Sequence, residues 1–594
     1  MTGGYAFGPR VARDGVGFRL WAPAARTVEL LLDRPLPMTR DADGWFAADV
    51  AGLGAGARYS FRIDGELDIA DPASAFQPDD VFGASEVIDF ASYRWRSEAW
   101  RGDSWRGRPW AEAVICELHV GAFTPQGTFR AAIDRLDHLA ETGFTAIELM
   151  PVADFAGRWN WGYDGVLMFA PDHSYGRPED LMALIDAAHA RNLMVFLDVV
   201  YNHFGPEGNY LHRIAPPFFT EHRHTPWGAA IDYRVPQVRA FAVENALHWL
   251  DRYRFDGLRL DAVHAIVERG EPTMLEELSR RVGALARERG RLIHLVLEDD
   301  DNRASALDPG ATVPVGKYRA QWNDDYHHAW HVTLTGESHG YYGDYADAPR
   351  RHLARTLASG FAYQGEPSRH RGMAPRGEDS GRLPPAAFVS FLQNHDQIGN
   401  RPHGDRLATC VPEDAQRAAL AVTLLAPMPV LMFMGEEWGT QRPFPFFCDF
   451  QGELAEAVRQ GRRREFAAAY GNLAEPVPDP LSMETFHSAK LDWPALQAPP
   501  HAARLALVRE LLTIRRREIV PHFTDAAQRD AHADGAVITA QWRGSGGRAL
   551  HLLANAGPDQ AAVGAVRANG RSIWGGTPPD ALPPWSVFWS VEEG

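Results

Sequence analysis

The sequence predicts an α/β protein in which a parallel (β/α)8 barrel lies between two β-domains. Three observations support this fold class: short apolar runs recur through the middle of the chain, amphipathic helical patterns separate most of them, and both ends alternate apolar and polar residues. The chain of 594 residues is long enough, since such a barrel takes about 250 residues or more. We expect the β-domains at 1–90 and 521–594 and the barrel at 91–520.

The N-terminal alternation includes residues 17–21, 27–32 and 58–63, with turn residues between them. This pattern is typical of a small β-sandwich. Alternation returns from about residue 525, in residues 536–542 and 550–554, and indicates a C-terminal antiparallel β-domain.

Eight apolar runs between these regions are candidate barrel strands. They lie at residues 114–119, 146–150, 193–198, 255–261, 292–298, 318–322, 388–394 and 430–434, and the sixth has the weakest pattern. Helical patterns rich in Ala, Leu, Arg and Glu occupy 178–190, 235–253 and 273–289. The regular order of strand, helix and strand predicts parallel pairing.

Charge and cysteine content limit the possible partners. The 60 basic and 77 acidic residues give a net charge of −17, which disfavours binding to nucleic acid or an anionic membrane and permits a neutral substrate. Cys116, Cys410 and Cys448 are too few and too scattered for a disulfide framework or a zinc site. No basic end precedes an apolar run near residue 1, and no run is long enough to span a bilayer. We expect a cytoplasmic protein without a cofactor.

Polar side chains follow four of the predicted strands. Residues 255–261 place Arg259 and Asp261 on the same face of a strand, a pattern that taken alone is typical of a structural ion pair. The other three runs end at Asp198, at Glu298, and at residues 394–396, Asn-His-Asp. Because the carboxyl ends of barrel strands converge on one face, we expect these side chains to form an active site there.

These segments also carry a family resemblance. DVVYNH at 198–203, GLRLDAVH at 257–264, the strand ending at Glu298, and QNHDQ at 393–397 resemble, in order, the four signature motifs of the α-amylase family of retaining α-glucan enzymes. The resemblance implies that Asp261 is the nucleophile, Glu298 the acid/base, and Asp396 a residue that binds sugar hydroxyls near the transition state. The alternative for Glu298 is a helix N-cap region, because three aspartates follow it.

Retaining hydrolysis uses an ionised carboxylate and a protonated carboxyl about 5 Å apart. Arg259 would keep Asp261 ionised, and the apolar run before Glu298 would raise the pKa of that carboxyl. The resemblance further implies that His203 and His395 bind the sugar in the cleaved subsite, that Asp198 braces Arg259, and that Tyr163 stacks on the sugar. Buried structural roles are the alternative for the two histidines and for Tyr163.

Three further features indicate which members of the family the chain resembles and where it departs from them. The N-terminal pattern resembles the immunoglobulin-like module of branching, debranching and trehalose-releasing members, in which Trp21 and Trp45 could bind glucan, although packing between sheets is favoured. His264 stands three residues after Asp261, where a lysine usually begins a Lys-His pair, so we expect different contacts to the leaving group. Asn202 resembles a calcium ligand of the amylases. Residues 204–232 offer few further oxygen ligands, so no required metal is predicted.

Residues 321–329, 336–338, 360–368 and 371–372 resemble the trehalose-releasing members, which hydrolyse the α-1,4 bond beside the terminal trehalose of maltooligosyltrehalose. Asp324, Asp325 and His328 would then contact the leaving group. A 1,4-α-glucan branching enzyme is the alternative. A catalytically inactive glucan-binding protein is disfavoured, because Asp261, Glu298 and Asp396 are all present.

Overall fold

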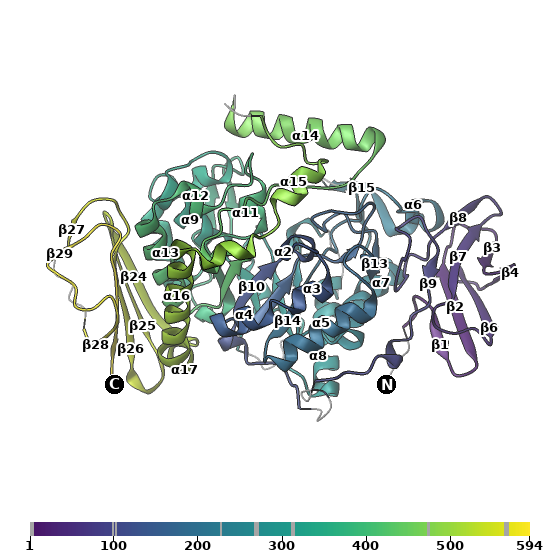
Figure 1. The fold of residues 1–594 in the computed structure, drawn as a ribbon, viewed down its shortest axis with the longest axis horizontal. Helices are drawn as coiled ribbons and strands as arrows, with labels where there is room; N and C mark the ends of the chain where they lie inside the picture. Colours follow the sequence, from purple (N-terminus) through teal and green to yellow (C-terminus); the bar gives the residue numbers. More distant parts are fainter. Residues whose placement is uncertain are drawn as a thin grey trace.

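The computed structural model describes residues 5–97, 100, 104–225, 228–266, 272–310, 315–471, 476–563 and 569–594. Its centre is a closed barrel of eight parallel strands, paired in sequence order (Figure 1). The barrel strands are β10 (Val114–Leu118), β11 (Ala146–Leu149), β14 (Met194–Val199), β17 (Gly257–Leu260), β18 (His294–Leu297), β19 (Ala320–Trp322), β22 (Phe388–Phe391) and β23 (Val430–Phe433). The predicted barrel is confirmed, including its weak sixth strand.

Every residue of these eight strands is buried. Parallel strands are covered on both faces, which explains why they are read in the sequence as continuous apolar runs. Gly257 begins β17 at a point of close approach, where a Cβ atom would lie 2.3 Å from the carbonyl oxygen of His294. A side chain there would push β17 away from β18.

Helices surround the barrel, among them α5 (Pro178–Ala190), α7 (Pro236–Leu247), α8 (Met274–Arg289), α13 (Glu413–Leu425) and α16 (Pro499–Ile514). In α8 a capping box formed by Thr273 and Glu276 satisfies the first turn, and Gly290 ends the helix in the left-handed conformation. The helix predicted at 235–253 consists of α7 followed by one π-helical turn, His248–Arg252.

The N-terminal strands form two antiparallel sheets of orders β1-β2-β6-β5 and β4-β3-β7-β8, with β9 also paired to β7. They are β1 (Arg10–Ala12), β2 (Gly15–Trp21), β3 (Val28–Leu31), β4 (Pro35–Pro37), β5 (Thr39–Arg40), β6 (Trp45–Ala51), β7 (Arg58–Ile63), β8 (Leu67–Ile69) and β9 (Ser85–Glu86). Trp21 and Trp45 are buried. Trp21 packs on Phe218 and Trp45 on Phe7, so both serve packing rather than an open binding surface.

A C-terminal antiparallel sheet has the order β24-β25-β26-β30-β28, as predicted. Its strands are β24 (Gln528–Asp534), β25 (Val537–Arg543), β26 (Ala549–Asn555), β30 (Val587–Glu592) and β28 (Arg571–Trp574). Figure 1 places the two β-domains at opposite ends of the molecule, and α14 (Gly452–Tyr470) lies along its upper edge.

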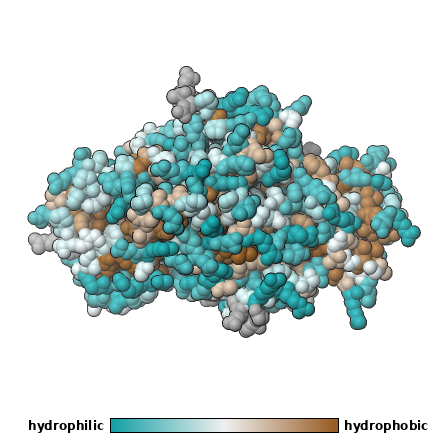
Figure 2. All heavy atoms as spheres, in the orientation of Figure 1, coloured by the Kyte–Doolittle hydropathy of each residue, from teal (hydrophilic) through white to brown (hydrophobic). Residues whose placement is uncertain are grey.

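The surface in Figure 2 is mainly hydrophilic, and its apolar residues are scattered in small groups. Within the described residues, no helix combines the length and apolar character needed to cross a membrane.

Candidate active site

Three neighbouring strands deliver charged side chains to the carboxyl end of the barrel. Asp198 is the second-last residue of β14, Arg259 lies in β17, and Glu298 directly follows β18. The Nη1 of Arg259 donates to Asp198 Oδ2 and to Asp261 Oδ1, each at 2.7 Å. Its Nη2 lies 3.6 Å from Glu298 Oε2. One buried guanidinium therefore contacts three carboxylates, and Asp198 braces it as the resemblance implied.

Asp261 is held from a second side by Asn202. The Nδ2 of Asn202 donates to Asp261 Oδ2 at 2.8 Å and to the Asp261 carbonyl at 3.0 Å. These bonds and the bond from Arg259 fix the orientation of the Asp261 carboxylate. Asp261 is only 8% exposed. Asn202 thus supports the candidate nucleophile.

Glu298 has the environment expected of a general acid. Burial, followed by the nearby charges of Asp261 and Asp324, raises its pKa well above the usual range, although Arg259 opposes the shift. The backbone N–H of Ala262 donates to Oε2 at 2.6 Å, and Ala262 adopts a left-handed conformation with φ of 41°. Since that bond uses Oε2 as an acceptor, a proton on this carboxyl belongs on Oε1.

His395 and Tyr163 lie against each other beside this group. Their rings stack with centroids 5.0 Å apart and an angle of 22°. The hydroxyl of Tyr163 donates to Asp198 Oδ2 at 2.5 Å. A sugar can therefore stack only on the other face of Tyr163. Asp396, next to His395, has a side chain that is 44% exposed, so it is open to a ligand.

His203 is placed differently from the prediction. Its Nε2 lies 2.8 Å from the carbonyl oxygen of Tyr163, and its Nδ1 contacts Asn202 Oδ1. Both ring nitrogens already face protein acceptors, and a ring nitrogen makes one such bond at a time. The expected bond from His203 to a sugar is not supported. The ring instead connects the loop of Tyr163 to Asn202.

Three of the four predicted leaving-group residues have side chains that could still contact a ligand. Asp324 is half-buried, accepts from Gln397 Nε2 at 3.3 Å, and has a pKa raised to about 7 by burial and by Asp300. His264 is also half-buried, and its Nδ1 accepts from the backbone N–H of Asp300. His328 packs on Tyr341, and its Nδ1 is buried without a hydrogen-bond partner. These three remain candidates for contact with a ligand.

Asp325 corrects the sequence prediction. It is fully buried, and its carboxylate contacts five donors from the protein: Asn302, Tyr345, Ala362, Tyr363 and Arg376. No acceptor capacity is left for a sugar hydroxyl. The prediction of a substrate contact is therefore wrong for Asp325, which anchors the loop after residue 360.

That loop continues to the segment behind Glu298. Arg371 pairs with Asp300 at 2.5 Å and with Asp301 at 2.7 Å, and Arg376 pairs with Asp300 at 3.1 Å. The loop therefore fixes the residues that immediately follow the candidate acid. We call residues 360–376 the strap.

Sequence reasoning missed three contributors inside the barrel. Trp322, at the end of β19, lies under Arg259 with 4.2 Å between the guanidinium carbon and the ring centroid. Glu117 on β10 contacts His395, and Glu148 on β11 is buried with both carboxylate oxygens lacking hydrogen-bond partners. The sequence did contain a sign of the two glutamates, because each is a charged residue inside an otherwise apolar predicted strand.

The bonds made by Asn202 also bear on metal binding. Its side chain is engaged by Asp261 and His203, so it is not free to join a calcium site. In the described part of the chain, Asp154, Asp172 and His173 bring possible ligand atoms within 4.8 Å of one another. Contact with Asp154 and the charge of Asp172 raise the pKa of His173 to about 9, although burial opposes this.

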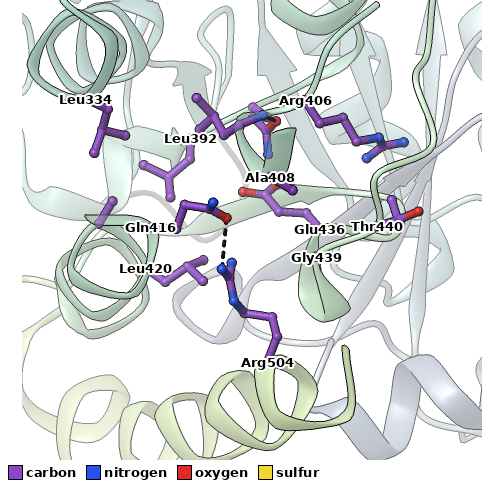
Figure 3. Close-up of a pocket in the computed structure, with 13 residues that line it drawn as sticks. Leu334, Leu392, Arg406, Ala408, Gln416, Leu420, Glu436, Gly439, Thr440 and Arg504 are labelled. Atoms are coloured by element: carbon purple, nitrogen blue, oxygen red, sulfur yellow. Dashed lines mark hydrogen bonds between the residues drawn. The ribbon is translucent and has the colours of Figure 1, made fainter. Parts of the chain in front are cut away.

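A small cavity lies between the segment that follows β22, helix α13, the turn η9 (Glu436–Trp438) and helix α16 (Figure 3). Gln416 accepts from Arg504 at 2.8 Å across it, and Glu436 points into it. Its volume of about 20 Å³ suits a water molecule, which needs about 10–15 Å³ by this measure, and is too small for a sugar.

Comparison with known proteins agrees with this architecture. Residues 98–223 match the model of the alpha amylase catalytic domain, and residues 6–74 match carbohydrate-binding module 48, the isoamylase N-terminal domain. A crystal structure from Salmonella typhimurium, whose protein is described only as an alpha amylase, has a TM-score of 0.94 and 44% identity and covers 99% of this chain and 100% of its own.

Two named relatives distinguish the alternatives. The malto-oligosyltrehalose trehalohydrolase of Deinococcus radiodurans is 42% identical over 93% of this chain and 89% of its own length. A 1,4-alpha-glucan branching enzyme of Jannaschia sp. is 33% identical over only 44% of this chain and 41% of its own length. The chain therefore belongs to the malto-oligosyltrehalose trehalohydrolase family, within the α-amylase group of glycosidases.

Proposed function

We propose that this enzyme hydrolyses the α-1,4 bond beside the terminal trehalose of maltooligosyltrehalose and releases trehalose and a maltooligosaccharide. Similarity to trehalohydrolases along nearly the whole chain supports the substrate. The observation that carries the chemistry is the contact of Asp261 and Glu298 with the single guanidinium of Arg259. This arrangement holds the carboxyls of Asp261 and Glu298 close together. Asp261 accepts hydrogen bonds from Arg259 and Asn202, whereas Glu298 accepts one from the backbone of Ala262.

The two carboxyls divide the reaction. Asp261 attacks the anomeric carbon of the sugar in the cleaved subsite while Glu298 donates its proton to the departing oxygen of trehalose. The covalent glycosyl-enzyme is then attacked by water, from which Glu298 removes a proton, and the anomeric configuration is retained. Asp396, with its exposed carboxylate, binds hydroxyls of the reacting sugar.

Specificity for trehalose is assigned to Asp324, His264 and His328, together with the strap. Trehalose joins its two glucoses anomer to anomer, so its outer ring is turned relative to that of a maltose unit. A buried donor or acceptor matched to that ring is left unpaired by the wrong leaving group, which penalises it strongly. His328 Nδ1, buried without a partner, is such a group.

A branching enzyme would share the first half of this reaction and transfer the glucan to another chain instead of to water. The partial coverage of the branching-enzyme relative favours hydrolysis. We also propose a cytoplasmic location, because the three cysteines are all free thiols, as is usual in a reducing compartment.

Product analysis tests this function. Purified enzyme is incubated with maltooligosyltrehalose, and the products are separated by chromatography and followed by ¹H NMR. We expect free trehalose and an α-configured maltooligosaccharide in equal amounts. Products with new α-1,6 branch points, or release of maltose without trehalose, would contradict the proposal.

A further inference from the structure

We propose that Glu117 is a positioning residue that holds His395 as an imidazolium, with its Nε2–H directed toward Asp396 and the sugar of the cleaved subsite. Glu117 lies in the middle of β10, inside the barrel, and does not reach the substrate itself. The inference rests on the proposed function, because it concerns the charge of a group within the same site.

Glu117 contacts His395 at two atoms, the ring Nδ1 and the backbone nitrogen. Its Oε1 lies 2.5 Å from the ring Nδ1, and its Oε2 accepts from the backbone N–H of His395 at 3.1 Å. Both residues are 1% exposed. A carboxylate only accepts hydrogen bonds, so Nδ1 must carry a proton. The hydrogen bond from the backbone N–H of His395 to Oε2 holds the imidazole ring in place relative to the Glu117 carboxylate.

The other ring nitrogen also faces an acceptor. Nε2 of His395 lies 3.4 Å from Oδ2 of Asp396. With a carboxylate at each nitrogen, both nitrogens carry protons and the ring is a cation. Tyr163 stacks on this ring, and Trp161 meets it nearly at a right angle with centroids 5.6 Å apart. These aromatic rings favour a cation and fix its orientation.

Other charged or titratable groups also act on this ring: His119, Glu148, Asp198 and Arg259. Burial lowers the pKa of His395 and Arg259 does the same, but Asp396 and Glu117 outweigh them and raise it to about 9. Burial and the charge of Glu117 raise the pKa of Glu148 well above its usual range. This shift favours the protonated form of Glu148, and Glu117 is the carboxylate in direct contact with the ring.

The charge on His395 decides what its Nε2 offers to a ligand. An imidazolium donates from both nitrogens, so Nε2–H can be donated to Asp396 or to a sugar hydroxyl. If the ring were neutral with its proton on Nδ1, Nε2 would become an acceptor. Glu117 thus keeps a donor in the cleaved subsite at neutral and mildly alkaline pH.

The experiment combines NMR with kinetics. In protein labelled with ¹⁵N-histidine, the His395 signals are assigned by their loss in His395→Gln, and we expect an imidazolium between pH 6 and 8. Glu117→Gln is isosteric and uncharged, and losing an opposite charge should lower the pKa of His395 by about 1–3 units. On maltooligosyltrehalose, kcat/KM of Glu117→Gln should fall about tenfold more at pH 8 than at pH 5.5.

Glu148→Gln is the matched control, since it replaces a neutral buried carboxyl with a neutral amide and should leave the His395 titration unchanged. Neutral His395 in the wild-type enzyme at pH 7, or an unchanged titration in Glu117→Gln, would overturn the proposal. The wild-type titration of His395 does not use Glu117→Gln, so the result stands even if that variant does not fold. Because the spectrum needs no substrate either, failure of trehalose release would count against the proposed function alone.

Discussion

The two ends of strand β17 each carry a buried aspartate, and the protein holds them in opposite ways. At the N-terminal end of the barrel, Asp256 is contacted by four groups: Trp105, His189, the backbone N–H of Val195, and Arg291. At the C-terminal end, Asp261 shares Arg259 with Asp198 and Glu298. Both aspartates are screened from water, but Asp256 has four donors of its own, whereas Asp261 has Asn202 and an arginine that it shares with two other carboxylates.

The electrostatics differ accordingly. Burial alone would raise the pKa of Asp256, but His189, Arg291 and Trp105 outweigh it and lower the pKa to about 2. At the other end, burial raises the pKa of Asp198 to about 6 despite Arg259. Arg259 Nε and Asp198 Oδ1 are buried there without hydrogen-bond partners. Raised pKa values together with unpaired buried polar atoms beside the candidate nucleophile are features of a site that receives a ligand.

The largest expected effect follows from removing the candidate nucleophile. Asp261→Asn changes almost no volume, and we expect it to reduce kcat by about 10⁴-fold or more, because the covalent intermediate can no longer form. The melting temperature should change little. Steady-state kinetics and thermal denaturation check both points. A variant with near-wild-type kcat would remove Asp261 from the mechanism.

The opposite result is expected at the other end of β17. Asp256→Asn leaves Arg291 without its carboxylate and cannot accept from all the present donors, so we expect a loss of about 3–5 kcal/mol of stability. The activity per folded molecule should remain close to that of the wild type. Denaturant titration and active-site titration separate the two quantities. An Asp256→Asn variant with normal stability but lost activity would contradict the structural role assigned to Asp256.

A third prediction uses the raised pKa of Glu298. The acid works only while protonated, so activity is present below its folded pKa and is lost as pH rises through that value. Because the folded state binds the proton more tightly than the unfolded state does, this carboxyl also destabilises the fold increasingly at higher pH. Glu298→Gln should reduce kcat about 10²–10⁴-fold and still raise the melting temperature at pH 8 relative to the wild type. A lower melting temperature at pH 8 would contradict a raised pKa.

The smallest effect is expected from chelation. Asn202 is occupied by Asp261 and His203, so incubation with EDTA should leave kcat/KM unchanged. Loss of activity that added calcium restores would show that Asn202 exchanges these partners for a metal ion.

The sequence predicted the barrel well because its strands are apolar along their whole length and end in charged residues. Asp261, Glu298 and Asp396 could be located for the same reason. The sequence could not separate Asp324 from Asp325, because adjacent carboxylates at the start of α9 (Asp324–Thr335) face different surroundings only after the strap folds over them. Glu117 was missed because its partner His395 lies 278 positions away.

The comparison of kcat/KM for maltooligosyltrehalose and for the unmodified maltooligosaccharide of equal length tests the central claim most directly. His328 Nδ1, which we propose to lie on the leaving-group side, is buried without a hydrogen-bond partner and requires a matching group on the substrate. We predict that the trehalose-ended substrate reacts at least about 10²-fold faster, within the range that unpaired buried groups impose on a mismatched substrate. Equal values of kcat/KM for the two substrates would contradict the assignment of a trehalose-specific hydrolase.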